Sequence, residues 1–197
     1  IPTIKDYLKM TKLDNQTAED VGLAFAGCLR DQIRFTVNEA ARATNVSLPI
    51  FAFINPGPVR EFKAIWSAFS QGIAIWTILE KDPELRENEK ALRKIIHNMQ
   101  TASEKILAPK IFQHMSNDQW DRYNTAKRDF LRMAQDTTTM KYDFADAFLR
   151  FYHGEGSKKI NDRVRQNTVR QVELVSGVFL RLYEVVASHP VAAKVAQ

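Results

Sequence analysis

A run of sixteen residues without a charged side chain, Ala64–Leu79, most constrains how this chain can fold. Charged residues make up 26% of the 197-residue sequence, but none lies in this run. Apolar side chains recur there at helical spacing, and small or apolar residues cover most of the opposite face. A helix that is apolar nearly all round is a buried one. The run therefore predicts a central apolar helix over about 59–80, with Trp66, Phe69, Ile73 and Trp76 nearly inaccessible.

The same run is too short to cross a membrane. A spanning helix needs about 20 apolar residues, and this run also contains serine, glutamine, glycine and threonine. We therefore predict no membrane span. No secretory signal pattern is visible, and Cys28 is the single cysteine, so an intrachain disulfide is excluded. These features favour a reducing compartment or a virion over secretion, with Cys28 as a buried structural thiol.

Apolar periodicity elsewhere predicts an all-α multi-helix bundle of six to seven helices, forming one domain over 1–197. Capping-box spacings at Thr17/Asp20 and Ser116/Gln119 mark two helix starts. Asp82-Pro83 marks a third, with aspartate as the cap and proline in the first turn. The expected helices cover about 17–45, 59–80, 82–107, 116–136 and 157–188, with a short aromatic helix ending at Gly154, and short arms at 1–12 and 190–197.

The segment Val46–Pro58 is the one stretch whose structure the pattern leaves open. It contains three prolines and the apolar residues 50–54. These are compatible with a strand, a packed loop or an interface that exposes Phe51 and Phe53. We favour a packed loop, because no second strand pattern is available for pairing.

Sequence signatures of catalysis, metal binding or nucleotide binding are missing. The four histidines lie outside zinc-protease and di-iron patterns, and no glycine-rich phosphate loop is present. Asp143 and Asp146 have magnesium-site spacing but lack a second acidic motif, so we interpret them as surface carboxylates. Asn15 and Asn45 begin glycosylation sequons that we interpret as helix boundaries. We therefore expect a protein that is not an enzyme and needs no cofactor.

Basic helix faces are the strongest functional signal. The net charge is +5 and the pI about 9.3, which favours acidic partners such as nucleic acid. Basic residues recur at steps of three and four along two predicted helices, and such steps share a helix face. Solvated helix faces also carry such residues, so a phosphate-binding role is a hypothesis. The candidate phosphate ligands are Lys158, Lys159, Arg163, Arg165, Arg170, Arg86, Lys90 and Arg93.

The 157–188 helix is the best candidate for this role. Asp162 is the only acidic residue between Lys158 and Arg170. The predicted helix N-terminus at Ser157 would add backbone N–H groups that favour phosphate. Aromatic residues that could stack on bases are Trp120, Tyr123, Tyr142 and Tyr152.

These observations favour a non-enzymatic α-helical nucleic-acid-binding protein, DNA or RNA undetermined. Self-assembly as a coat or nucleocapsid-type protein is part of this hypothesis, with homo-oligomer contacts through the terminal arms. The alternative is an α-helical interaction module, such as an adaptor, effector or secretion-complex subunit, which binds an acidic protein surface. A third hypothesis is an apolar ligand pocket lined by Trp66, Trp76, Phe144 and Tyr152, for which no acid or base partner is evident.

Overall fold

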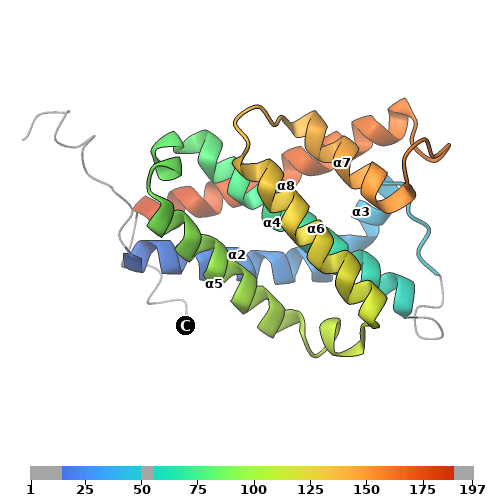
Figure 1. The fold of residues 1–197 in the computed structure, drawn as a ribbon, viewed down its shortest axis with the longest axis horizontal. Coiled ribbons are helices and arrows are strands. Elements are labelled where there is room, and N and C mark those ends of the chain that lie inside the picture. Colours follow the sequence, from blue (N-terminus) through green and yellow to red (C-terminus); the bar gives the residue numbers. More distant parts are fainter. Residues whose placement is uncertain (1–14, 50–55, 189–197) are drawn as a thin grey trace, which may run out of the picture.

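A computed structural model describes residues 15–49 and 56–188, and in these ranges the chain is an all-α bundle without strands. The terminal arms, Phe51 and Phe53 lie outside the described residues. Seven α-helices and two 3-10 turns are described, labelled as in Figure 1. They are α2 (Asn15–Phe35), α3 (Val37–Ala43), α4 (Gly57–Lys81), η1 (Pro83–Arg86), α5 (Glu89–Leu107), η2 (Phe112–His114), α6 (Asn117–Gln135), α7 (Lys141–His153) and α8 (Asp162–Ser188). The predicted all-α class is confirmed.

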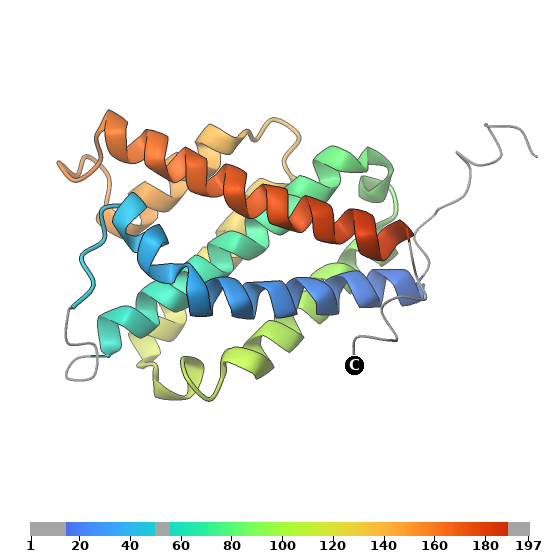
Figure 2. The same cartoon turned by 180° about the vertical axis from the view of Figure 1, so that it is seen from behind.

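Helix α4 carries the uncharged run and is buried along most of its length. Every residue from Ala64 to Leu79 except Trp76 is buried. Helix α4 contacts α2, α3, α5, α6 and α8. Figures 1 and 2 show α6 on one side of α4 and both α2 and α8 on the other. This arrangement explains why α4 carries no charged side chain from Ala64 to Leu79, because neighbouring helices cover nearly all of this part of it.

Three of the four α4 side chains expected to be inaccessible are so. Trp66, Phe69 and Ile73 are at most 1% exposed, whereas Trp76 is only partly buried. The indole Nε1–H of Trp76 donates to the carbonyl oxygen of Thr139 at 3.1 Å, in the α6–α7 connection. This hydrogen bond holds the ring at the edge of the core and satisfies its polar end.

Aromatic side chains fill the space between α4, α6 and α7. The Phe69 ring lies 5.2 Å from Phe130 of α6 and 4.7 Å from Phe148 of α7, between centroids. Trp66 meets the edge of Phe148 at 5.2 Å. Such tilted and edge-to-face pairs add to the stabilisation that burial gives. Trp66 and Phe144 are therefore packed into the core, and they do not form the ligand pocket hypothesised from the sequence.

Two glycines allow helix backbones to approach closely. A Cβ on Gly72 of α4 would lie 2.8 Å from Cβ of Phe130 on α6. A Cβ on Gly22 of α2 would lie 2.7 Å from the carbonyl oxygen of Ile95 on α5. The α4–α6 and α2–α5 pairs pack along much of their length in the bundle. Because glycine has no side chain, the two helices of each pair can approach closely at these crossings.

The expected 17–45 helix is two helices. Thr17 lies inside α2, which is described from Asn15, so Thr17 is not the cap that the spacing predicted. A bend at Thr36 separates α2 from α3. The Thr36 hydroxyl donates to the carbonyl oxygen of Gln32 at 2.9 Å, and this back-bonding bends helices. The predicted capping box at Ser116 and Gln119 is confirmed at the start of α6.

The helix expected to begin at Asp82 instead begins at Glu89. Residues Pro83–Arg86 form the 3-10 turn η1, and Asn88 caps α5 by accepting from the Ala91 N–H at 3.2 Å. The Asp82 carboxylate is engaged elsewhere, because its Oδ2 accepts from the Tyr183 hydroxyl at 2.9 Å. This bond ties the end of α8 to the α4–η1 junction.

The last helix also begins later than expected, at Asp162 instead of Ser157. Gly154 and Gly156 both have positive φ, and residues 157–160 form a turn in which the Ile160 N–H donates to the Ser157 carbonyl. The Asn161 side chain accepts from the Val164 N–H at 3.1 Å and so caps α8. The α7–α8 connection therefore contains Ser157, Lys158 and Lys159, and these residues do not lie at a helix N-terminus.

No helix in the described ranges has the length and apolar character needed to span a bilayer. This finding agrees with the prediction of no membrane span.

Candidate nucleic-acid interface

The predicted basic residues lie in two groups at opposite ends of α8. The Tyr183–Asp82 hydrogen bond places η1 and the start of α5 beside the C-terminal end of α8. Arg163 is twenty residues from Tyr183 along the helix, a distance of about 30 Å at 1.5 Å per residue. Figure 1 shows the start of α5 at one end of the bundle and the α7–α8 connection at the other. The structure does not merge the two groups into one local groove.

Two of the three cations near α5 have intramolecular partners. Arg86 is only 21% exposed, donates to the Gln135 carbonyl at 2.8 Å and lies 3.6 Å from Glu80. Arg86 therefore joins η1 to the end of α6. Arg93 pairs with Glu89 one turn earlier at 2.9 Å, on an exposed surface. Lys90 alone in this group is exposed and has no ion pair within the described ranges.

The second group contains four cations without a carboxylate partner in the described part of the chain: Lys158, Lys159, Arg163 and Arg170. All four are exposed. Their neighbour Arg165 differs, because it lies 3.1 Å from Asp146 of α7 and 3.5 Å from Asp162. Arg165 therefore holds α7 against α8. Three acidic side chains close to this group in sequence also have other partners: Asp162 lies beside Arg165, Glu155 beside Arg150 at 4.0 Å, and Glu173 pairs with Lys141.

Two hydrogen bonds attach the α7–α8 connection to the end of α3. The Asn45 side-chain amide donates to the Lys159 carbonyl at 3.2 Å. His153 Nε2 lies 2.7 Å from the carbonyl oxygen of the buried residue Thr44. Asn45 takes a positive φ of 56° to end α3, which agrees with its interpretation as a helix boundary. These contacts fix the backbone that carries Lys158 and Lys159.

The attachment brings in a cation that no sequence pattern identified. Arg42 is exposed in the last turn of α3, three residues before Asn45, and forms no ion pair in the described ranges. No spacing rule links Arg42 to Lys158, because the contact between α3 and the α7–α8 connection is long-range. Figure 2 shows α3 beside the start of α8.

The aromatic residues proposed for base stacking have different environments. Tyr123 is fully buried, and burial together with nearby Glu104 raises its pKa. Trp120 is partly buried and stacks on Phe112 at 5.2 Å. Tyr142 is 61% exposed near the start of α7, and Tyr152 is half-buried beside the α7–α8 connection. Tyr123 is therefore inaccessible to a ligand, whereas Tyr142 has the most exposed ring of the four.

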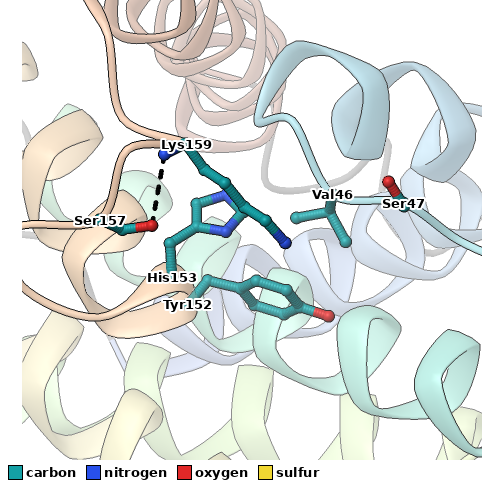
Figure 3. Close-up of a pocket in the computed structure, with 6 residues that line it drawn as sticks. All are labelled: Val46, Ser47, Tyr152, His153, Ser157 and Lys159. Carbon is teal, nitrogen blue, oxygen red and sulfur yellow. Dashed lines mark hydrogen bonds between the residues drawn. The ribbon is translucent and has the colours of Figure 1, made fainter.

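A polar depression of about 230 Å³ lies between the end of α3, the end of α7 and the α7–α8 connection. Figure 3 shows the Lys159 side chain reaching toward the rings of His153 and Tyr152, with Ser157 bonded to the Lys159 backbone N–H. The lining residues are Val46, Ser47, Tyr152, His153, Ser157 and Lys159. Of these, only Lys159 was predicted from the sequence as a phosphate ligand.

Metal-binding and thiol chemistry receive no support from the described residues. No group of three or more His, Cys, Asp or Glu side chains there could hold a metal ion. Asp143 accepts from the Met140 N–H at 2.7 Å and Asp146 pairs with Arg165, so both carboxylates stabilise α7 and its packing. Cys28 is partly buried, and burial raises its pKa to about 11, which keeps the thiol protonated at neutral pH.

Comparison of the chain with protein-family models, curated proteins and solved structures gives no match.

Proposed function

We propose that this protein binds nucleic acid through the basic end of the bundle formed by Lys158, Lys159, Arg163 and Arg170. One observation carries the proposal: these four exposed cations lie within thirteen residues and have no carboxylate partner in the described ranges. Unpaired lysines and arginines attract phosphates and release counterions on binding. Phosphate contacts of this kind give affinity that depends little on base sequence.

The geometry supports a non-catalytic role for this surface. Arg163 and Arg170 are seven residues apart and share the outward face of α8. At 1.5 Å per residue they lie about 10 Å apart along the helix, which suits contact with more than one phosphate along a strand. Assembly of several copies along a strand, as in coat or nucleocapsid-type proteins, remains an extension of this proposal.

Charge reversal with a matched control tests the proposal. The Arg163→Glu/Arg170→Glu variant should lose most affinity for a labelled single-stranded oligonucleotide, at least tenfold at low salt, by fluorescence anisotropy. The control, Arg128→Glu/Arg132→Glu, makes the same change in net charge on α6, where both arginines lie near Asp129. Equal losses in the two variants would show that only net charge matters and would refute the proposed surface.

A second candidate function, binding of an acidic protein partner, is favoured by the rest of the α8 face. Leu174, Val178 and Val185 are 63%, 48% and 57% exposed, and they follow Arg170 at steps of four, four and seven. Arg170 and Arg181 flank these apolar side chains without ion pairs in the described part. Charge complementarity suits an amphipathic helix whose apolar stripe is bordered by carboxylates.

The two functions separate by substitution. Leu174→Gln/Val185→Gln should leave oligonucleotide affinity within twofold if the basic end binds phosphates. The same variant should weaken binding of an acidic amphipathic peptide if the second function holds. An oligonucleotide affinity that is unchanged in Arg163→Glu/Arg170→Glu, together with acidic-peptide binding that falls in Leu174→Gln/Val185→Gln, would reverse the order of the candidates.

A further inference from the structure

We infer that the depression lined by Ser47, Ser157 and Lys159 is a phosphate-binding subsite. This inference deepens the proposed function and rests on it. The subsite would hold one phosphate group of a bound strand, while the neighbouring arginines attract the rest of the backbone. The ligand class is a phosphate ester, carried either within a strand or at its 5′ end.

The lining of the depression supplies donors and a positive charge without a carboxylate. Lys159 contributes an ammonium group that has no ion pair in the described ranges. The Ser157 oxygen already accepts from the Lys159 N–H at 3.3 Å, so its hydroxyl hydrogen is free to donate. Ser47 is exposed and adds a second hydroxyl. Three donors of this kind complement the oxygens of a phosphate.

The rings of Tyr152 and His153 complete the wall of the depression, and each has a hydrogen-bonding role that its surroundings determine. Burial raises the pKa of Tyr152 to about 12, with Glu61 adding to the rise, so the phenol is a donor at neutral pH. Because the Thr44 carbonyl can only accept, His153 donates to it through Nε2, which leaves Nδ1 as the free ring nitrogen. Figure 3 shows both rings beside the Lys159 side chain.

A neighbouring depression provides an internal comparison. It shares Ser157 but is lined by Asp146, Arg150, Gly156, Ile160 and Arg165. Its carboxylate pairs with Arg165 at 3.1 Å, and its other arginine lies 4.0 Å from Glu155. An anion entering it would meet Asp146 and already engaged arginines. The Lys159 depression is the one of the two with an available cation.

The size and rigidity of the depression also favour a small anion. At about 230 Å³ it lies below the range of roughly 300–1,000 Å³ typical of drug-sized ligands. The Asn45–Lys159 and His153–Thr44 hydrogen bonds hold its walls on both sides. Walls fixed in advance reduce the entropy lost when a ligand binds.

The test uses inorganic phosphate as the probe and the full chain as the protein. Phosphate is titrated at constant ionic strength against chloride, and the ring resonances of His153 are followed by NMR. The variants are Lys159→Gln and Ser157→Ala, and the matched control is Lys90→Gln. Lys90 is likewise an exposed lysine without an ion pair in the described part, but it lies at the other end of the bundle and does not line the depression. We expect the His153 resonances to shift saturably with phosphate, with a phosphate affinity at least tenfold lower in Lys159→Gln and within twofold of wild type in Lys90→Gln.

Equal loss of phosphate affinity in Lys159→Gln and Lys90→Gln, or His153 shifts that do not saturate, would overturn the subsite. Oligonucleotides with and without a 5′-phosphate then identify the source of the ligand. Stronger binding of the 5′-phosphorylated strand that depends on Lys159 supports a terminal phosphate, whereas equal binding that depends on Lys159 supports a backbone phosphate.

The two proposals fail separately. Oligonucleotide binding that needs Arg163 and Arg170, without saturable phosphate binding at Lys159, removes only the subsite. Saturable phosphate binding without oligonucleotide binding removes only the proposed function.

Discussion

At the scale of single residues, the space around each helical glycine decides what a side chain there would do. Gly22 and Gly72 stand where a Cβ would lie under 3.0 Å from backbone or Cβ atoms of a neighbouring helix. Gly27 and Gly177 have no atom within 4 Å of a Cβ position. All four lie inside helices, where alanine is intrinsically preferred over glycine by about 1 kcal/mol.

Alanine substitutions should therefore change the free energy of unfolding in opposite directions at the two kinds of position. Gly72→Ala and Gly22→Ala should each destabilise by about 1–3 kcal/mol, because the helices must separate or distort. Gly27→Ala and Gly177→Ala should stabilise by about 0.5–1 kcal/mol. Urea denaturation measures all four. A stabilised Gly72→Ala variant would contradict the close α4–α6 crossing.

At the scale of helices, the sequence predicts which segments are helical better than where they begin. The uncharged run predicts α4 within about two residues at each end, because burial along most of the helix selects apolar residues. The starts of α5 and α8 were expected too early, since Asp82 binds Tyr183 and Ser157 lies in a turn. A tertiary contact of this kind leaves no periodic signal in the local sequence.

The start of α8 at Asp162 gives a direct prediction. Asn161→Ala removes the side chain that accepts from the Val164 N–H, and loss of such a cap typically costs about 1 kcal/mol. Ser157→Ala should change the free energy of unfolding by less than about 0.5 kcal/mol, because Ser157 caps no helix. Chemical denaturation of both variants checks this. The reverse order of effects would place the helix start at Ser157.

At the scale of the whole molecule, several buried thiol and phenol groups keep their protons to higher pH in the folded state than in the unfolded chain. Burial raises the pKa of Cys28 to about 11 and of Tyr152 to about 12, and it also raises the pKa values of Tyr123 and Tyr183. The Tyr183 hydroxyl additionally donates to Asp82. A group whose folded pKa is raised contributes stability below its unfolded pKa, and this stability is lost as the pH rises.

Stability should accordingly be constant near neutral pH and fall from about pH 9 upward, as the unfolded chain releases protons that the folded chain retains. Tyr183→Phe should make this alkaline decline shallower, although it also leaves Asp82 without its hydrogen bond at neutral pH. Tyr142→Phe changes an exposed ring and is the matched control. Denaturation series at pH 7–11 measure the effect, and an unchanged slope in Tyr183→Phe would contradict it.

Only part of the candidate site could be predicted from sequence. Steps of three and four identified Lys159, Arg163 and Arg170, since a shared helix face or a short connection is a local property. The same rule also selected Arg86 and Arg93, and Arg165 was included because it stands beside the stepped residues. The partners of Arg86 and Arg165, Gln135 and Asp146, are visible only in the folded chain. Ser47 lines the depression because the Asn45–Lys159 and His153–Thr44 hydrogen bonds join segments more than one hundred residues apart, and no local pattern encodes these contacts.

The salt dependence of oligonucleotide affinity tests the central claim most directly. We compare wild type, Lys158→Gln/Lys159→Gln/Arg163→Gln/Arg170→Gln, and a control with the same net charge, Lys90→Gln/Arg93→Gln/Arg128→Gln/Arg132→Gln. For single strands, the slope of log K against log salt falls in magnitude by about 0.7 for each phosphate that the protein no longer neutralises. The slope of the first variant should be smaller by about 3 if all four cations bind phosphates, and the control should keep the wild-type slope. Equal slopes for the two variants, or a smaller slope in the control than in the first variant, would contradict the assignment of the basic end as the nucleic-acid interface.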